Sequence, residues 1–121
     1  MIALWVAVFG GLGAVLRFVT DGTIRTVLGR KFPWGTLIIN VIGSFILGLL
    51  AGFVLNNEAS NNLLLIIGTG FCGGFTTFST SIFEAVRLIE ERRYTAVMIQ
   101  IIGTAILSLS AAAVGLWLTH V

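Results

Sequence analysis

The sequence predicts an all-α membrane protein with four transmembrane helices. Of its 121 residues, 57% are hydrophobic and only 10% are charged, and the mean hydropathy is +1.06. A soluble domain of this length would carry more charge. A spanning helix needs about 20 apolar residues, and four runs contain no Asp, Glu, Lys or Arg: residues 1–16, 32–57, 59–83 and 94–121. We therefore expect residues 1–121 to form a single membrane unit without a soluble domain.

The first two spans are separated by a short polar link. The first is predicted over residues 2–19 and the link over residues 21–31. The second span is predicted over residues 34–55 and is entered at Pro33. Proline suits the start of a helix, where its missing N–H would have no partner anyway.

The third and fourth spans are joined by a strongly charged link. A polar turn over residues 56–62 leads into the third span, predicted over residues 63–86. The link over residues 87–93 carries five charges in seven residues, and the fourth span is predicted over residues 95–118.

Small residues recur at four-residue spacing within the spans, a pattern that lets transmembrane helices approach closely. For Gly48 and Gly52 of the second span we expect ordinary close packing. Gly70, Gly73 and Gly74 of the third span lie beside a cluster of hydroxyl side chains, and for these we expect a functional role.

The basic residues are distributed unevenly between the two sides of the membrane. The first and third links lie on one side because an even number of crossings separates them. They hold all six Lys and Arg residues outside the spans: Arg25, Arg30, Lys31, Arg87, Arg92 and Arg93. Because basic links face the cytoplasm, both termini are predicted to lie outside.

The third span contains the most informative segment of the chain. Residues 68–81 hold four glycines and six hydroxyl side chains, within the uncharged run of residues 59–83. A continuous helix at bilayer depth would not favour this composition. Non-helical backbone survives there only where it lines a cavity or is buried in protein. We therefore predict that the third span is broken at mid-membrane and that an ion or substrate path lies beside the break.

A break would leave N–H and C=O groups without partners, at several kcal/mol each in hydrocarbon. A second copy related by a two-fold axis, or a cation bound by carbonyl oxygens, would satisfy them. Gly73 and Thr76 are the candidate carbonyl donors.

The polar side chains of the spans suit a small anion. Hydroxyl and amide groups can replace water around an anion without trapping it as a buried Lys or Arg would. Phe78 can add the positive edge of an aromatic ring. The alternative is that each hydroxyl bonds within its own helix or to a neighbouring one. The candidates are Asn40, Thr77, Ser79, Thr80, Ser81, Thr104 and Ser108.

Two charged residues lie close to the hydrocarbon. Arg17 lies near the end of the first span, where it can snorkel to the interface or attract anions to a vestibule. Glu84 is expected at the interface as well.

Other functional classes find little support. There is no nucleophile–base pair and no cluster of metal ligands, so an enzyme is not expected. A net charge of +2 without a basic and aromatic patch does not indicate nucleic acid. Residues 68–73 fit G-x-G-x-x-G, but they lie inside a predicted span rather than in a strand–helix–strand unit. The expected surroundings are membrane lipid.

Three segments carry a family resemblance that covers all four spans. They are Gly-Ala-Val-Leu-Arg-Phe (residues 13–18), Pro-Trp-Gly-Thr-Leu-Ile-Ile-Asn (residues 33–40) and Gly-Phe-Cys-Gly-Gly-Phe-Thr-Thr-Phe-Ser-Thr (residues 70–80). With these segments the chain resembles the Fluc (CrcB) family of bacterial fluoride channels, which implies passive fluoride efflux across the inner membrane.

The resemblance also implies an assembly and a site. It implies an antiparallel, dual-topology dimer with two pores between the subunits, and a structural Na⁺ at the dimer centre held by the carbonyls of Gly73 and Thr76. The pore residues it implies are Asn40, Phe78, Thr77, Ser79, Thr80, Thr104 and Ser108.

One position departs from the family pattern. Ser81 stands where a second pore phenylalanine belongs, and Phe83 lies roughly 200° around the helix from it. A chain that inserts in both orientations should also have similar numbers of basic residues in the links on its two sides, whereas here all six lie on one side. One hypothesis is a heterodimer with a related subunit of opposite orientation and one impaired pore. The other is a homodimer in which Ser81 is tolerated.

Two further alternatives remain open from the sequence. One is a non-conducting partner subunit. The other is a small multidrug-type transporter, which normally needs a carboxylate within the first helix, and residues 2–19 have none.

Overall fold

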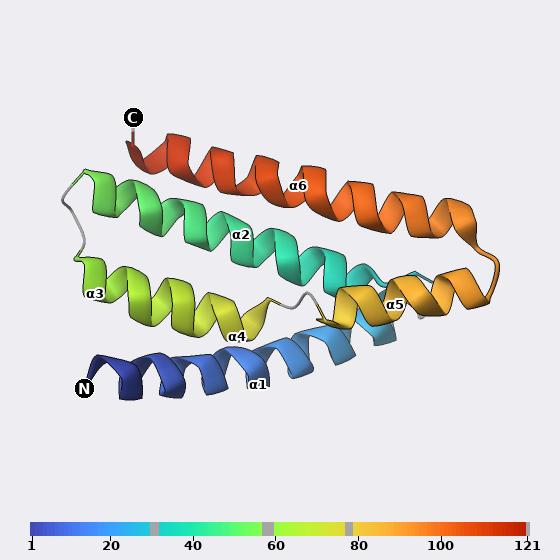
Figure 1. Ribbon diagram of the computed structural model, residues 1–121, viewed down its shortest axis with the longest axis horizontal. Coiled ribbons are helices and arrows are strands. Elements are labelled where there is room, and N and C mark those ends of the chain that lie inside the picture. Colours follow the sequence, from blue (N-terminus) through green and yellow to red (C-terminus); the bar gives the residue numbers. More distant parts are fainter. Residues whose placement is uncertain (30–31, 57–59, 77–78, 121) are drawn as a thin grey trace.

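The computed structural model describes residues 1–29, 32–56, 60–76 and 79–120, with the backbone alone at Ser79 and His120. All regular secondary structure in these ranges is helical (Figure 1). Four segments are long and apolar enough to cross a membrane, as predicted. The elements are α1 (Ile2–Leu28), α2 (Trp34–Leu55), α3 (Asn61–Leu63), the π-helix η1 (Leu64–Cys72), α4 (Gly73–Phe75), α5 (Ser79–Glu90) and α6 (Tyr94–His120).

The helices run side by side, with α2 between α6 and the third span, and α1 against the other side of the third span (Figure 1). The N-terminus, the end of α2, the start of α3 and the end of α6 lie at one end of the molecule. The end of α1, the start of α2, the end of α5 and the start of α6 lie at the opposite end (Figure 1). The basic residues Arg25, Arg87, Arg92 and Arg93 therefore share one end.

Helix α1 is longer than its apolar run. It was predicted to end at residue 19 but continues to Leu28, so most of the predicted polar link is helical. Asp21 and Arg25 form an i,i+4 ion pair at 3.1 Å, and the Thr23 hydroxyl donates to the Val19 carbonyl at 3.0 Å. The ion pair stabilises helix in a polar sequence, and the threonine bond satisfies its hydroxyl within the same helix.

The third span is built from several helical segments. The Ser60 side chain caps its start by accepting a hydrogen bond from the Leu63 N–H at 3.1 Å. Helical backbone continues to Phe75, and Thr76 is extended (φ −80°, ψ 161°). Residues 77–78 lie outside the described ranges, so the break of this span at mid-membrane stays a prediction.

Glycine allows α2 and α6 to touch backbone to backbone. A Cβ at Gly48 would collide with the Ala112 carbonyl oxygen, and one at Gly52 would collide with the Thr119 hydroxyl. On α6, a Cβ at Gly115 would lie 2.6 Å from the Phe45 carbonyl oxygen. The packing role predicted for Gly48 and Gly52 is confirmed.

A second pair of helices is joined in the same way. A Cβ at Gly74 would collide with the Gly10 carbonyl oxygen, and one at Gly70 would lie 2.9 Å from the Val6 carbonyl oxygen. Gly70 and Gly74 therefore pack the third span against α1. A functional role was predicted for these two glycines, and close packing was predicted only for Gly48 and Gly52. Gly73 differs from them, because a Cβ there would have no atom within 4 Å.

We expect Gly48→Ala to lower the stability of the protein by about 1–3 kcal/mol, since the added methyl group forces α2 away from α6. Gly22→Ala is the matched control, because a Cβ at Gly22 meets nothing within 4 Å and Ala is the better helix former. Thermal unfolding in detergent should show a lower Tm for the first variant and an equal or higher Tm for the second. Equal effects of the two changes would contradict this account of the packing.

Candidate functional site

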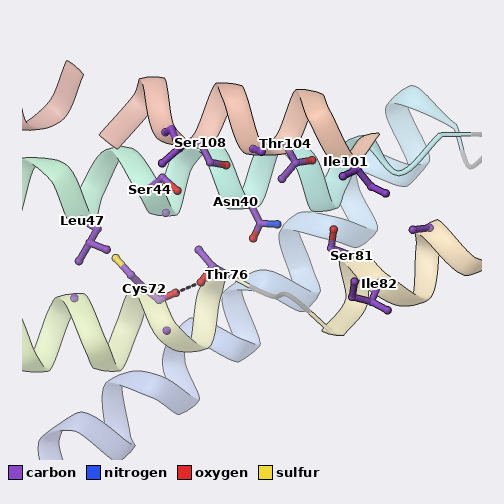
Figure 2. Close-up of a pocket in the computed structure, with 16 residues that line it drawn as sticks. Asn40, Ser44, Leu47, Cys72, Thr76, Ser81, Ile82, Ile101, Thr104 and Ser108 are labelled. Atoms are coloured by element: carbon purple, nitrogen blue, oxygen red, sulfur yellow. Dashed lines mark hydrogen bonds between the residues drawn. The ribbon is translucent and has the colours of Figure 1, made fainter. Parts of the chain in front are cut away.

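A cavity of about 680 Å³ lies between α2, the third span and α6 (Figure 2). Leu47, Ile82, Ile101 and Leu109 supply part of its apolar wall. Its polar lining consists of Asn40 and Ser44 from α2, Thr76 and Ser81 from the third span, and Thr104 and Ser108 from α6. Four predicted anion-path residues, Asn40, Ser81, Thr104 and Ser108, are thus brought together from three spans.

Helix α2 contributes one face to the cavity. Asn40 and Ser44 are four residues apart and so lie one above the other on the helix. Figure 2 shows Asn40 directed between Thr76 and Ser81. A Cβ at Gly43 would collide with the Thr76 methyl group. Gly43 therefore lets the end of α4 touch α2 beside the cavity.

Thr76 closes the helical segment that ends at Phe75. Its hydroxyl donates to the Cys72 carbonyl at 2.7 Å, and its N–H donates to the same oxygen at 2.8 Å. For Thr76 the alternative of a hydroxyl bonded within its own helix is therefore correct. The hydrogen of the Thr76 hydroxyl is therefore not available to a ligand in the cavity.

The residues around Thr76 suit a small hard cation. Gly73 also lines the cavity, and the space at its Cβ position is open. Carbonyl oxygens at a helix C-terminus carry partial negative charge and are ligands that hard cations accept. No group of three or more His, Cys, Asp or Glu side chains in the described ranges could hold a metal. The oxygens available to a cation here are therefore neutral ones, from the backbone and from side chains such as Asn40 and Ser44.

Helix α6 presents a row of polar side chains at four-residue spacing. Gln100, Thr104 and Ser108 each have a buried side-chain oxygen without a hydrogen-bond partner in the described structure: Gln100 Oε1, Thr104 Oγ1 and Ser108 Oγ. Thr and Ser in membrane helices commonly bond to the preceding turn, but these two do not. Since buried polar groups nearly always have partners, Thr104 and Ser108, which line the cavity, are candidates to bond water or a ligand there.

Other predicted residues lie elsewhere. Arg17 and Thr80 line a separate cavity of about 240 Å³, together with Asp21 and Thr36. Thr77 and Phe78 lie outside the described residues, as does the side chain of Ser79. Their place in the site stays a prediction.

Gln100 was not predicted as a site residue. Its side chain is fully buried, and its Nε2 donates to Ser81 at two atoms, the carbonyl at 3.0 Å and Oγ at 3.3 Å. The four-residue spacing from Gln100 to Thr104 and Ser108 was the sequence signal that could have identified it.

Glu84 is buried within the protein, and its expected place at the membrane interface stays a prediction. Its side chain is only 7% exposed and pairs with Arg25 of α1 at 3.2 Å and with Arg87 at 2.7 Å. Arg25 also pairs with Asp21, and Arg87 with Glu91 at 3.6 Å. This charge network ties α5 to α1 at the end of the molecule that carries the basic links.

Comparison with known proteins gives matches along nearly the whole chain. The family model described as "CrcB-like protein, Camphor Resistance (CrcB)" matches residues 4–116. A protein of Leifsonia xyli named fluoride-specific ion channel FluC 1 is 48% identical, over 98% of this chain and 86% of its own length. FluC 2 of Mycobacterium bovis is 41% identical over 99% and 94% of the two chains. FluC of Syntrophotalea carbinolica is 41% identical over 97% and 96%.

We expect Glu84→Ala to lower stability by about 1–3 kcal/mol, because it leaves two arginines without their shared carboxylate. The cost stays below that of a fully buried pair because both arginines are partly exposed. Glu91→Ala is the matched control, since this carboxylate is 45% exposed and its pair is long. The measurement is Tm in detergent, and a Tm for Glu84→Ala no lower than that of the control would contradict the role of the network.

Proposed function

The chain belongs to the CrcB-like family, and from this membership we infer that it is a fluoride-selective ion channel of the bacterial cell membrane. The observation that carries this function is the extent of the match. Relatives named fluoride-specific ion channels align with 97% to 99% of the chain at 41% to 48% identity. The four spans agree with a multi-pass membrane protein. The function is passive fluoride efflux, which lowers fluoride in the cytoplasm.

The cavity offers what a fluoride ion needs in order to leave water. The Thr104 and Ser108 hydroxyls are buried, have no partner in the described structure and can donate to an anion. No lysine or arginine is among the residues that line the cavity, so an ion held there would not be trapped by a fixed charge. Side chains four residues apart are about 6 Å apart along a helix, a spacing that suits stepwise transfer from one donor to the next.

We propose that the working channel is an antiparallel dimer with a broken third span and pores between the subunits. The extended backbone at Thr76 supports the break. Large apolar side chains exposed along α1, α5 and α6 give a second copy and lipid ample surface to cover, among them Phe18, Phe83, Ile101 and Leu109. In this proposal Phe78, Thr77, Ser79 and Thr80 of the third span complete the pore with the residues of the cavity, and Arg17 serves a vestibule.

We also propose a structural Na⁺ at the dimer centre, held by the carbonyls of Gly73 and Thr76. Its charge would offset the negative ends of two helical segments that meet there. The open space at Gly73 and the extended backbone at Thr76 support this placement.

The purified chain, reconstituted alone into liposomes, is expected to release fluoride and not chloride. Asn40→Ala should lower fluoride release about tenfold or more, since a hydrogen bond to an ion is worth about 1.5–3 kcal/mol. Ser110→Ala is the control, because Ser110 is an exposed residue that does not line the cavity. An ion-selective electrode measures the release.

The same experiment separates the remaining alternatives. Robust fluoride release by the chain alone removes the need for a related partner subunit. Release of chloride at the same rate as fluoride, or no release of fluoride, would contradict the proposed function.

Replacing Na⁺ throughout purification by a bulky organic cation should weaken the dimer, since the opposed helix ends would lose their counter-charge. The measurement is the dimer fraction by cross-linking in detergent, with Na⁺ restored in a parallel sample as the control. An unchanged dimer fraction without Na⁺ would contradict the cation site.

A further inference from the structure

We propose that Gln100 is a positioning residue of the fluoride path, which acts by turning the Ser81 hydroxyl into a hydrogen-bond donor toward the cavity. This inference rests on the proposed function. It concerns the position at which the chain departs from the phenylalanine of the family pattern.

The contact between the two residues joins two helices. The Gln100 side chain on α6 is fully buried, and its Nε2 lies 3.0 Å from the Ser81 carbonyl and 3.3 Å from the Ser81 hydroxyl on α5. The carbonyl of Ser81 can only accept, so this contact fixes which end of the carboxamide is the N–H₂ group. Two N–H bonds are available, one for each oxygen of Ser81.

The consequence for Ser81 follows from counting donors and acceptors. A serine hydroxyl has one O–H and two lone pairs. In this structure one lone pair accepts from Gln100, which leaves the O–H to be directed elsewhere. Ser81 lines the cavity and Gln100 does not. A hydroxyl that accepts one hydrogen bond also donates a stronger one. Gln100 thereby prepares Ser81 to donate to an anion.

The surroundings keep this contact in place. Toward the link between α5 and α6, Ala85 and Leu88 of α5 pack with Val97 of α6 in a buried apolar cluster. In the other direction along α6, the next residue on the same face, Thr104, lines the cavity. Gln100 therefore lies where the interface between α5 and α6 opens. Its own Oε1 accepts no hydrogen bond in the described structure, so no donor at that atom holds the carboxamide in another orientation.

A double-mutant cycle in liposomes tests the proposal. Gln100→Met keeps an unbranched side chain of similar length and removes the amide. We expect fluoride release to fall about three- to tenfold, the range that corresponds to the loss of one neutral hydrogen bond. In a Ser81→Ala background the same change should have no further effect, because the hydroxyl on which Gln100 acts is absent. Ser81→Thr keeps the hydroxyl and should preserve the sensitivity to Gln100→Met.

A purely structural role for Gln100 predicts a different result. Gln100→Met would then reduce fluoride release by the same factor with Ser81 or with alanine at position 81, and this outcome overturns the proposal. Unchanged release by Gln100→Met overturns it as well, while fluoride release by the unmodified chain keeps the proposed function intact. If the unmodified chain releases no fluoride, both the proposed function and this inference fail. Tm values of all variants identify those that do not fold.

Discussion

Close contact between helix backbones, made at glycine, is the constraint on which the architecture depends. Gly48, Gly52 and Gly115 hold α2 against α6, and Gly70 and Gly74 hold the third span against α1. The result is two tightly joined helix pairs. The cavity lies where the pairs face one another, between α2, the third span and α6. A methyl group at one of these glycines would thus alter the cavity without touching its lining.

Within hydrocarbon, each polar group needs a partner inside the protein, and this requirement separates two kinds of hydroxyl here. Thr76 donates to its own preceding turn, as membrane threonines commonly do. The hydroxyls of Thr104 and Ser108 make no such hydrogen bond, although both oxygen atoms are buried. The cost of leaving them unpaired is reasonable only if something passes or resides beside them. The same helix carries both the hydrophobic surface and this polar row.

Features controlled by hydropathy and composition could be predicted from the sequence. Features determined by particular polar contacts could not. The bounds of α2 agree with the prediction because proline and an asparagine-rich turn delimit it. The extension of α1 was missed because the Asp21–Arg25 pair stabilises a polar stretch as helix. Asn40, Thr104 and Ser108, which were predicted for the anion path, line one cavity, and their role in that path stays a prediction. The burial of Glu84 and the contact between Gln100 and Ser81 were missed, because partners distant in sequence determine both.

The length of α1 has a consequence for the membrane around the protein. Its 27 residues extend about 40 Å, against about 30 Å for the hydrocarbon layer. The last turns of α1 therefore reach the depth of the phosphate headgroups, and they carry Arg25 to its contact with Glu84. Lipid phosphates at that depth are expected to compete with Glu84 for the Arg25 guanidinium, so the strength of this ion pair should depend on the charge of the surrounding lipid.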